Sequence, residues 1–368
     1  MILTVTMNPA YDLTYRLEKF EYAAVQRIPA VEQRVGGKGL NVARVLGALG
    51  HEVIAMGFAD AAFARAAAAE MPVDFVEALP HVRRTVVLSE ADGTTTGLWE
   101  PGAALHDPAA ADELKDRISA RLPQARGLVI SGSLPAGLDP GFPAALARLA
   151  IRADVPVICD VDGEALRRAA RVEGVVLMPN TDELAALLSG VPGGHPASPR
   201  SAPNDHASVP GGALGDRAAL LGDVSEDPGR LLDVVQPMQK SGVAVIVATL
   251  GPAGVFATVR GKGWSAAPPT AISGNPTGAG DAAAAALIAG LAALPKIPRY
   301  IPPELSFPET IAPGWLGAPE LDWPALVAEV VATSAAAVAR PVAGEIDLDL
   351  RARLIPEIRV RDWHTWLY

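Results

Sequence analysis

Short apolar runs alternate with alanine- and leucine-rich stretches along most of this chain. Six runs are apolar throughout rather than at every second residue, which is typical of strands covered on both faces of a parallel sheet. They are Ile2–Thr6, Val53–Gly57, Gly127–Ser131, Val155–Asp160, Val175–Met178 and Val243–Thr249. Helical patterns lie between them, at Leu40–Leu49, Asp112–Leu122, Phe142–Ala153, Asp182–Leu188 and Arg230–Lys240. Strands that alternate with helices form βαβ units, so the sequence predicts a three-layer α/β/α fold with a mostly parallel central sheet.

Two segments depart from this alternation, at about residues 11–35 and 82–102. Both are richer in polar and β-forming residues, and in the second one Arg84, Val86 and Leu88 would share one side of a strand. Such spacing is typical of a half-exposed sheet. We therefore expect a small second sheet outside the main one. It is either a lid over an active site or a hairpin without a role of its own.

Two further segments are rich in glycine and proline and carry little periodicity. Residues 189–227 are rich in Gly, Pro and Ser, which predicts a flexible loop. Residues 294–324 are rich in proline but also contain four aromatic side chains, which favours an irregular loop packed on the surface. Both segments are interpreted as insertions.

The composition excludes several classes of partner. The chain has 31 Lys and Arg against 41 Asp and Glu, a formal net charge of -10, so no broad basic face is available for nucleic acid or an anionic membrane. The N-terminus lacks the basic and long apolar regions of a signal peptide, and no uninterrupted run of 18 apolar residues occurs. We therefore expect a cytoplasmic protein without a membrane partner.

The single cysteine, Cys159, excludes an intramolecular disulfide and fits a reducing compartment. It lies within an apolar run, so a buried thiol is favoured over a nucleophile.

The most informative stretch for chemistry is SGNPTGAGDAAAAALIAGL, which begins at Ser273. A small, glycine-rich turn opens onto a long alanine-rich helix, and the first amides of a helix have no partner within it. Such a terminus is a natural anion site. Asp281 lies in the first helical turn, where it is either a favourable N-terminal charge or a general base beside the anion site.

A second glycine-rich stretch, VGGKGLNVARVLGALG, begins at Val35. It is not a GxxxxGK[ST] loop, because Glu32 and Gly39 occupy the positions of its first glycine and its hydroxyl residue. It is not a GxGxxG loop either, because Val42 occupies the third glycine position. The stretch indicates either close backbone approach to a small polar ligand or a glycine-rich turn into a core helix.

Together, these two stretches resemble the two signature regions of the ribokinase/pfkB carbohydrate kinase family. The segments TVTMNPAYDLT, SGSLPAGLDP from Ser131 and MPNTDEL from Met178 look most like its 1-phosphofructokinase and tagatose-6-phosphate kinase branch. The resembling motifs occur in the same order from Met1 to about Leu291, and the resemblance resumes near 326–344. The two insertions are not part of it. It implies one ribokinase-like domain over residues 1–368, with the small sheet as a lid.

The resemblance also implies roles for the residues that match family motifs. Asp281 would be the catalytic base, with the amides of Gly278, Ala279 and Gly280 as its anion hole. The sugar site would include Asp12, Gly36, Gly37, Lys38 and Asn41, and the nucleotide site Thr249, Gly251, Gly254 and Thr277.

Asn180 and Glu183 match the family's NxxE motif, which organises magnesium through water. Mg²⁺ prefers oxygen ligands and commonly keeps several waters, so an Asn–Glu pair suits it. Without the other motifs, a helix cap followed by a first-turn acid is the favoured interpretation of this pair.

A sugar phosphate needs cations in this acidic chain. Arg27 matches a basic position before the first signature, Lys38 lies within it, and Arg83 or Arg84 matches the arginine of a lid strand. We favour Arg83, because that alignment places Thr85 at the family's asparagine position. Each cation alone is more typical of a solvated surface charge, and together they predict a phosphate-binding cluster.

Four departures from the family pattern leave the substrate and any monovalent-cation dependence open. The lid asparagine is replaced by Thr85 or Val86, and Trp99 begins the segment equivalent to NEPG. Met178 replaces a lysine, and Asn275 replaces an acidic residue before the glycine-rich turn.

The expected activity is ATP- and Mg²⁺-dependent phosphorylation of a ketohexose phosphate. The favoured reaction converts fructose 1-phosphate to fructose 1,6-bisphosphate. Other sugar phosphates (fructose 6-phosphate or tagatose 6-phosphate), a free sugar or a nucleoside are alternative substrates. A non-catalytic sugar- or nucleotide-binding regulator is the alternative from another class. The resemblance also suggests a homodimer formed through the lid.

Overall fold

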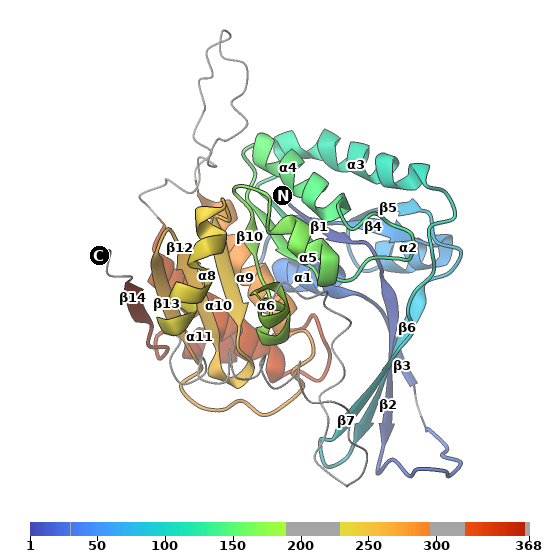
Figure 1. Cartoon of the computed structure of the whole chain (residues 1–368). Helices are drawn as coiled ribbons and strands as arrows, with labels where there is room; N and C mark the ends of the chain where they lie inside the picture. Colours follow the sequence, from blue (N-terminus) through green and yellow to red (C-terminus); the bar gives the residue numbers. More distant parts are fainter. Residues whose placement is uncertain (30, 189–228, 295–320, 365–368) are drawn as a thin grey trace, which may run out of the picture.

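A large twisted sheet forms the centre of the computed structural model, which describes residues 1–29, 31–188, 229–294 and 321–364 (Figure 1). Within these residues ten strands pair in the order β14-β13-β12-β11-β10-β9-β8-β1-β4-β5. Their bounds are β1 Ile2–Thr6, β4 Val53–Ala59, β5 Val73–Glu77, β8 Gly127–Ser131, β9 Val157–Asp160, β10 Val176–Leu177, β11 Val245–Thr249, β12 Val255–Val259, β13 Lys262–Ala266 and β14 Arg361–His364. The strands from β5 to β11 are parallel, whereas β12, β13 and β14 are antiparallel additions at one edge.

The apolar runs explain why the parallel strands form where they do. Every residue of β1, β8 and β9 is buried, as expected for strands covered on both faces. The predicted α/β class and the mostly parallel sheet are confirmed. All six predicted strands are present, although β9 begins two residues later than predicted and β10 has only two residues.

Helices cover both faces of this sheet (Figure 1). One layer contains α1 (Lys38–Ala48), α9 (Ala279–Ala293) and α10 (Trp323–Val338), with α11 (Leu348–Leu354) against α10. The other contains α3 (Ala109–Arg121), α4 (Phe142–Arg152), α5 (Gly163–Ala169), α6 (Thr181–Leu188) and α8 (Gly229–Lys240). A further helix, α2 (Ala61–Ala68), packs beside β5 and the start of the second sheet.

Helix α9 is the predicted alanine-rich helix, and it packs between α1 and α10. Its small side chains allow both neighbours to approach closely, so nearly all of the helix is buried, from Asp281 in the first turn to Ala292. This packing fixes the position of the N-terminus of α9, where the glycine-rich turn lies.

A second sheet projects from the main body (Figure 1). Its order is β3-β2-β6-β7, with β2 at Ala10–Leu17, β3 at Val31–Gly36, β6 at Arg83–Glu90 and β7 at Thr95–Trp99. Strand β2 pairs in parallel with β6, which places Asp12 opposite Thr85. The two segments predicted to pair outside the main sheet therefore do so, and we call this the lid sheet.

The first predicted insertion, 189–227, lies outside the described residues, as does most of the second, 294–324. The end of the second prediction is wrong, because α10 begins at Trp323. The side chain of Asp322 caps that helix by accepting a hydrogen bond from the amide of Ala325. In the part of the chain that is described, no helix is long and apolar enough to cross a membrane.

Candidate active site

A cavity of about 1120 Å³ lies between the lid sheet and the carboxyl ends of the parallel strands. Its floor includes Thr6 on β1, Gly132 after β8 and Asp160 at the end of β9. The chain runs from β1 outward to β4 and β5, and later returns on the other side of β1 with β8. Ligands of open α/β sheets bind at such a reversal of strand order. The fold therefore places this cavity where a ligand site is expected.

The N-terminus of α9 opens into the cavity through its glycine-rich turn. Gly278 caps the helix with φ 85°, and a Cβ there would lie 2.8 Å from the Cβ of Ala343. Gly278 and Gly280 line the cavity, whereas the amide of Ala279 donates to the carbonyl of Pro276 at 3.2 Å. The turn thus presents backbone amides at the positive end of a helix, with the amide of Ala279 already engaged.

Asp281 is buried at the edge of this turn, with 5% of its surface exposed. The Nδ2 of Asn41, on the neighbouring helix α1, donates to its Oδ2 at 2.9 Å. Burial raises the pKa of Asp281 to about 7, and the carboxylates of Asp160 and Asp12 also raise it. The charge of Lys38 and the hydrogen bond from Asn41 lower this pKa, but by less. A carboxyl group with a pKa near neutrality is suited to accept a proton at physiological pH.

Lys38 begins α1, directly after the cap residue Gly37, whose φ is 116°. Its Nζ lies 2.9 Å from the Oδ1 of Asp160. Burial lowers the pKa of Lys38, but the carboxylates of Asp160, Glu183 and Asp281 outweigh burial and hold the pKa above its usual value. The ammonium group of this cavity-lining residue therefore stays charged.

Asp160 was not identified from the sequence, although it ends one of the predicted strands. A carboxylate that directly follows a buried parallel strand lies at the edge where ligands bind, and this signal was available. Its partner Lys38 is 122 residues away in the chain, so the pair itself could not be deduced.

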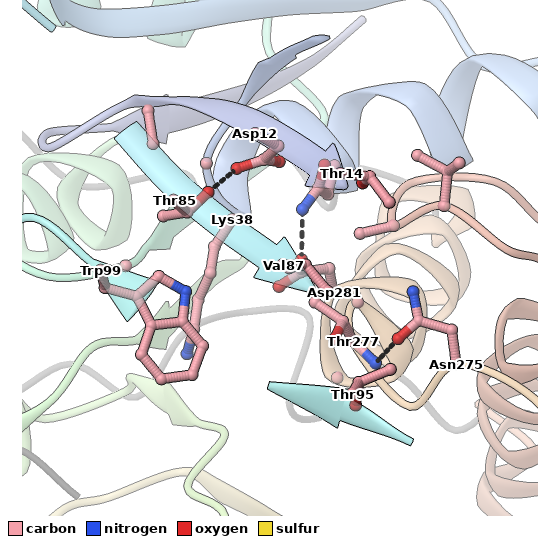
Figure 2. A pocket seen from close by; sticks show the side chains of 18 of the residues that line it. Asp12, Thr14, Lys38, Thr85, Val87, Thr95, Trp99, Asn275, Thr277 and Asp281 are labelled. Carbon is pink, nitrogen blue, oxygen red and sulfur yellow. Dashed lines mark hydrogen bonds between the residues drawn. The ribbon is translucent and has the colours of Figure 1, made fainter. Parts of the chain in front are cut away.

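Two side chains of the lid sheet face the cavity beside α1 (Figure 2). The hydroxyl of Thr85 donates to the Oδ1 of Asp12, and a Cβ at Gly36 would lie 2.0 Å from the Oδ2 of Asp12. Burial raises the pKa of Asp12, and this effect outweighs the hydrogen bond from Thr85 and the nearby arginines, which lower the pKa. Trp99, 58% exposed, pairs across from Thr85 and also lines the cavity. These contacts place acceptor oxygens and an aromatic ring over the floor.

The predicted cation cluster is only partly assembled. Lys38 and Arg83 line the cavity, whereas Arg84 is exposed outside its lining. The Nη atoms of Arg83 donate to the carbonyls of Glu100 at 3.0 Å and Asn8 at 3.4 Å, and its buried Nε has no partner among the described residues. Arg27 lies on the exposed connection between β2 and β3, away from the cavity lining, so its role remains a prediction.

Asn180 and Glu183 line the cavity at the start of α6 and cap that helix reciprocally. The amide of Glu183 donates to the Oδ1 of Asn180, and the amide of Asn180 donates to the Oε2 of Glu183, each at 2.9 Å. Burial raises the pKa of Glu183. In the described part of the chain no three His, Cys, Asp or Glu side chains are grouped to hold a metal. The pair has the oxygen donors that suit Mg²⁺ through water, but its cap explains the same residues.

The residues predicted for nucleotide binding divide into two groups. Thr249 and Thr277 line the cavity. Gly251 and Gly254 form the turn between β11 and β12, outside that lining. A Cβ at Gly254 would lie 2.0 Å from the carbonyl oxygen of Ala266, so close packing against β13 already requires glycine there.

Asn275, whose bond to Thr277 is drawn in Figure 2, ties the glycine-rich turn to the segment that follows α10. Its Oδ1 accepts from the amide of Thr277 at 3.0 Å, and its Nδ2 donates to the carbonyl of Pro341 at 3.0 Å. The sequence identified Asn275 only as a departure from a family pattern, because a contact over 66 positions leaves no local signal.

The thiol of Cys159 is buried, as the sequence predicted. Burial, with a contribution from Asp160, raises its pKa to about 12, so it is not a nucleophile at neutral pH.

Comparison with known proteins gives consistent matches over nearly the whole chain. The model of the pfkB family of carbohydrate kinases matches residues 5–208 and 213–340. A tagatose-6-phosphate kinase of Staphylococcus epidermidis is 28% identical over 298 residues, which cover 79% of this chain and 85% of that protein. Among solved structures, phosphofructokinase-2 from Escherichia coli in complex with potassium has a TM-score of 0.73 at 24% identity, covering 97% of this chain and 98% of that one. A possible 1-phosphofructokinase from Thermotoga maritima has a TM-score of 0.68 at 22% identity, covering 98% and 99%.

Proposed function

This chain belongs to the pfkB family of carbohydrate kinases, and on that premise we propose that it transfers the γ-phosphoryl group of ATP to a hydroxyl of a ketohexose phosphate. The observation that carries the proposal is Asp281, a buried carboxyl group with a pKa of about 7 beside a glycine-capped helix N-terminus. Members of the family are carbohydrate kinases, and 28% identity to a tagatose-6-phosphate kinase supports a phosphorylated sugar as acceptor.

In the proposed reaction, Asp281 accepts the proton of the attacking sugar hydroxyl. Its Oδ2 is held by Asn41, which leaves the other oxygen to face the hydroxyl. The amides of Gly278 and Gly280, together with the helix dipole, stabilise charge that develops on the transferred phosphoryl group. Lys38 contributes a second positive charge on the floor of the same cavity.

The oxygens of Asn180 and Glu183 would hold Mg²⁺ through water, which agrees with the donor preference of that ion. When bound, Mg²⁺ supplies positive charge that neutralises the phosphate oxygens during transfer. Thr249, which forms a β-bridge with Asn180, and Thr277 line the same cavity and would contact the nucleotide.

The lid sheet would bind the sugar. Asp12 would accept hydrogen bonds from sugar hydroxyls, Gly36 leaves room for that carboxylate, and Gly37 lines the same cavity. Arg83 also lines the cavity, and its guanidinium would pair with a substrate phosphate. Closure of the lid excludes water that would otherwise hydrolyse ATP.

Fructose 1-phosphate, phosphorylated at its 6-hydroxyl, is the acceptor we favour. Tagatose 6-phosphate is the second candidate, because a kinase for that sugar is the relative with 28% identity.

A coupled assay of ADP release tests the proposal over fructose 1-phosphate, fructose 6-phosphate, tagatose 6-phosphate and free hexoses. We expect the highest kcat/KM with fructose 1-phosphate. A preference for tagatose 6-phosphate would select the second candidate. Absence of sugar-dependent ADP release with every acceptor would refute the kinase and leave a binding protein.

A further inference from the structure

Arg44 lies one helical turn after Asn41 on α1, and the proposed reaction does not use it. Its side chain is 8% exposed, and it is not among the residues that line the cavity. The Nη1 of Arg44 donates to the Oδ1 of Asn41 at 3.3 Å. A buried guanidinium therefore contacts the residue that holds the proposed base.

This contact decides which way the amide of Asn41 points. An asparagine side chain has one acceptor oxygen and one donor nitrogen. Because Arg44 can only donate, the oxygen of Asn41 faces Arg44 and the nitrogen faces the Oδ2 of Asp281, at 2.9 Å. The reverse orientation would bring the amide oxygen against the carboxylate and leave two donors facing each other.

The guanidinium is itself fixed on two other sides. Its Nη2 donates to the carbonyl of Val35, at the end of lid strand β3, and to the Oε2 of Glu70 at 2.6 Å. Its Nε donates to the same carboxylate oxygen at 3.1 Å. Arg44 thus has one fixed orientation, and it connects the end of a lid strand to the residue that holds Asp281.

We propose that Arg44 is a positioning residue, which orients Asn41 so that the amide of Asn41 donates to Asp281 and keeps this carboxylate ionised and aimed at the substrate. The inference rests on the proposed function of Asp281 as the base. Three other charged groups act on Asp281: Lys38 on α1, Asp160 on β9 and Asp12 on the lid sheet. Substitution of Arg44 leaves all three in place.

A double-mutant cycle with Arg44→Leu and Asn41→Ala tests the proposal. Asn41→Ala removes the hydrogen bond that lowers the pKa of Asp281, and Arg44→Leu removes the contact that orients it, so we expect this pKa to rise in both variants. We expect kcat at pH 7 to fall roughly tenfold, and the acid limb of the pH profile to move to higher pH. If Arg44 acts through Asn41, the double variant equals the Asn41→Ala variant. The proposal would be overturned if the two falls in kcat multiply in the double variant, or if the acid limb of the pH profile is unchanged in Arg44→Leu.

Glu70→Gln is the matched control, because it removes the outer ion pair and leaves Arg44 against Asn41 and Val35. We expect its pH profile to equal that of the unchanged protein. A shift as large as that of Arg44→Leu would assign the effect to loosened packing and refute the positioning role. If Arg44→Leu does not fold, Arg44→Lys takes its place, since one ammonium group cannot satisfy all three acceptors of Arg44.

A second measurement keeps this inference separate from the proposed function. We would measure the free energy of unfolding from pH 4 to 8 for the unchanged protein and for Arg44→Leu, each with and without Asp281→Asn. The difference that Asp281→Asn makes in each background reports the pKa of Asp281 without catalysis. Because this pKa is raised on folding, ionisation of Asp281 destabilises the folded state as pH rises, and Arg44→Leu should enlarge that loss. If Asp281→Asn has the same pH-dependent effect on the free energy of unfolding with and without Arg44→Leu, the role of Arg44 is overturned, even if the protein phosphorylates no sugar. If that effect is larger in Arg44→Leu but the protein shows no kinase activity, only the proposed function is refuted.

Discussion

Helices α1 and α9 begin in the same way and carry opposite charges. Each is capped by a glycine with positive φ, Gly37 or Gly278, and each N-terminus lies at the cavity. The first residue of α1 is Lys38, a cation at the positive end of a helix, whereas α9 has Asp281 in its first turn. The helix dipole alone would favour the aspartate and disfavour the lysine.

The surroundings reverse both expectations. Burial raises the pKa of Asp281 to about 7 despite its place at a helix N-terminus. Lys38 keeps its charge because it faces Asp160, Glu183 and Asp281. The same backbone arrangement thus carries a charged lysine at one helix start and a carboxyl group that titrates near neutral pH at the other. Neighbouring side chains, rather than the helix termini, determine which group can exchange a proton.

The largest expected effect is at the α9 start. Asp281→Asn removes the proposed base and keeps the shape of the side chain, so kcat should fall by a factor on the order of 10² to 10⁴. Nucleotide affinity, measured by titration calorimetry, should change little. The matched control is Asp112→Asn, an exposed first-turn acid of α3, which should leave turnover unchanged. Near-normal turnover of Asp281→Asn would contradict the base assignment.

Lys38→Met tests whether the charge at the α1 start acts on the base of α9. In the unchanged protein, kcat/KM should fall about tenfold per pH unit below pH 7, as Asp281 becomes protonated. Lys38 lowers the pKa of Asp281, so its removal should move this limb to higher pH and lower kcat at pH 7 about tenfold. Lys115→Met, at an exposed ion pair of α3, is the control. Superimposable pH profiles for Lys38→Met and the unchanged protein would show that the two helix starts act independently.

The smallest effects concern the two caps and are measured as free energies of unfolding in denaturant titrations. Gly278→Ala and Gly37→Ala place a side chain at positive φ and against Ala343 or Thr6, so each should cost about 1–3 kcal/mol. Gly47→Ala, in the last turn of α1, meets no atom within 4 Å and should gain a few tenths to about 1 kcal/mol. Equal effects at the three glycines would show that the caps are not strained positions.

The sequence predicts the central strands of the main sheet well because their apolar runs are set by burial on both faces. Strand β1 has the predicted bounds for this reason. Strand β13 and the edge strand β14 were not predicted, since each is defined by its pairing, for example Trp264 with Asp362, rather than by its own pattern.

The candidate site shows the same division. Residues within one motif, such as Lys38 and Asn41 or Gly278 and Asp281, were identified together because short spacing fixes their relative positions. Contacts between distant segments, such as Lys38 with Asp160 or Asn275 with Pro341, have no counterpart in local spacing. The placement of Arg27 beside Lys38 and Arg83 required knowledge of how the lid connection folds, and the structure leaves Arg27 outside the cavity lining.

The bond between Asn275 and Pro341 has a consequence for the order in which the protein acquires activity during synthesis. The glycine-rich turn is held by Pro341 and packed by Ala343, which leave the ribosome more than 60 residues after Gly278. The parallel strands and the lid sheet are translated well before that point. A nascent chain can therefore form the parallel strands and the lid sheet while its glycine-rich turn is still unfixed, and the complete cavity forms only after Ala343 has been translated.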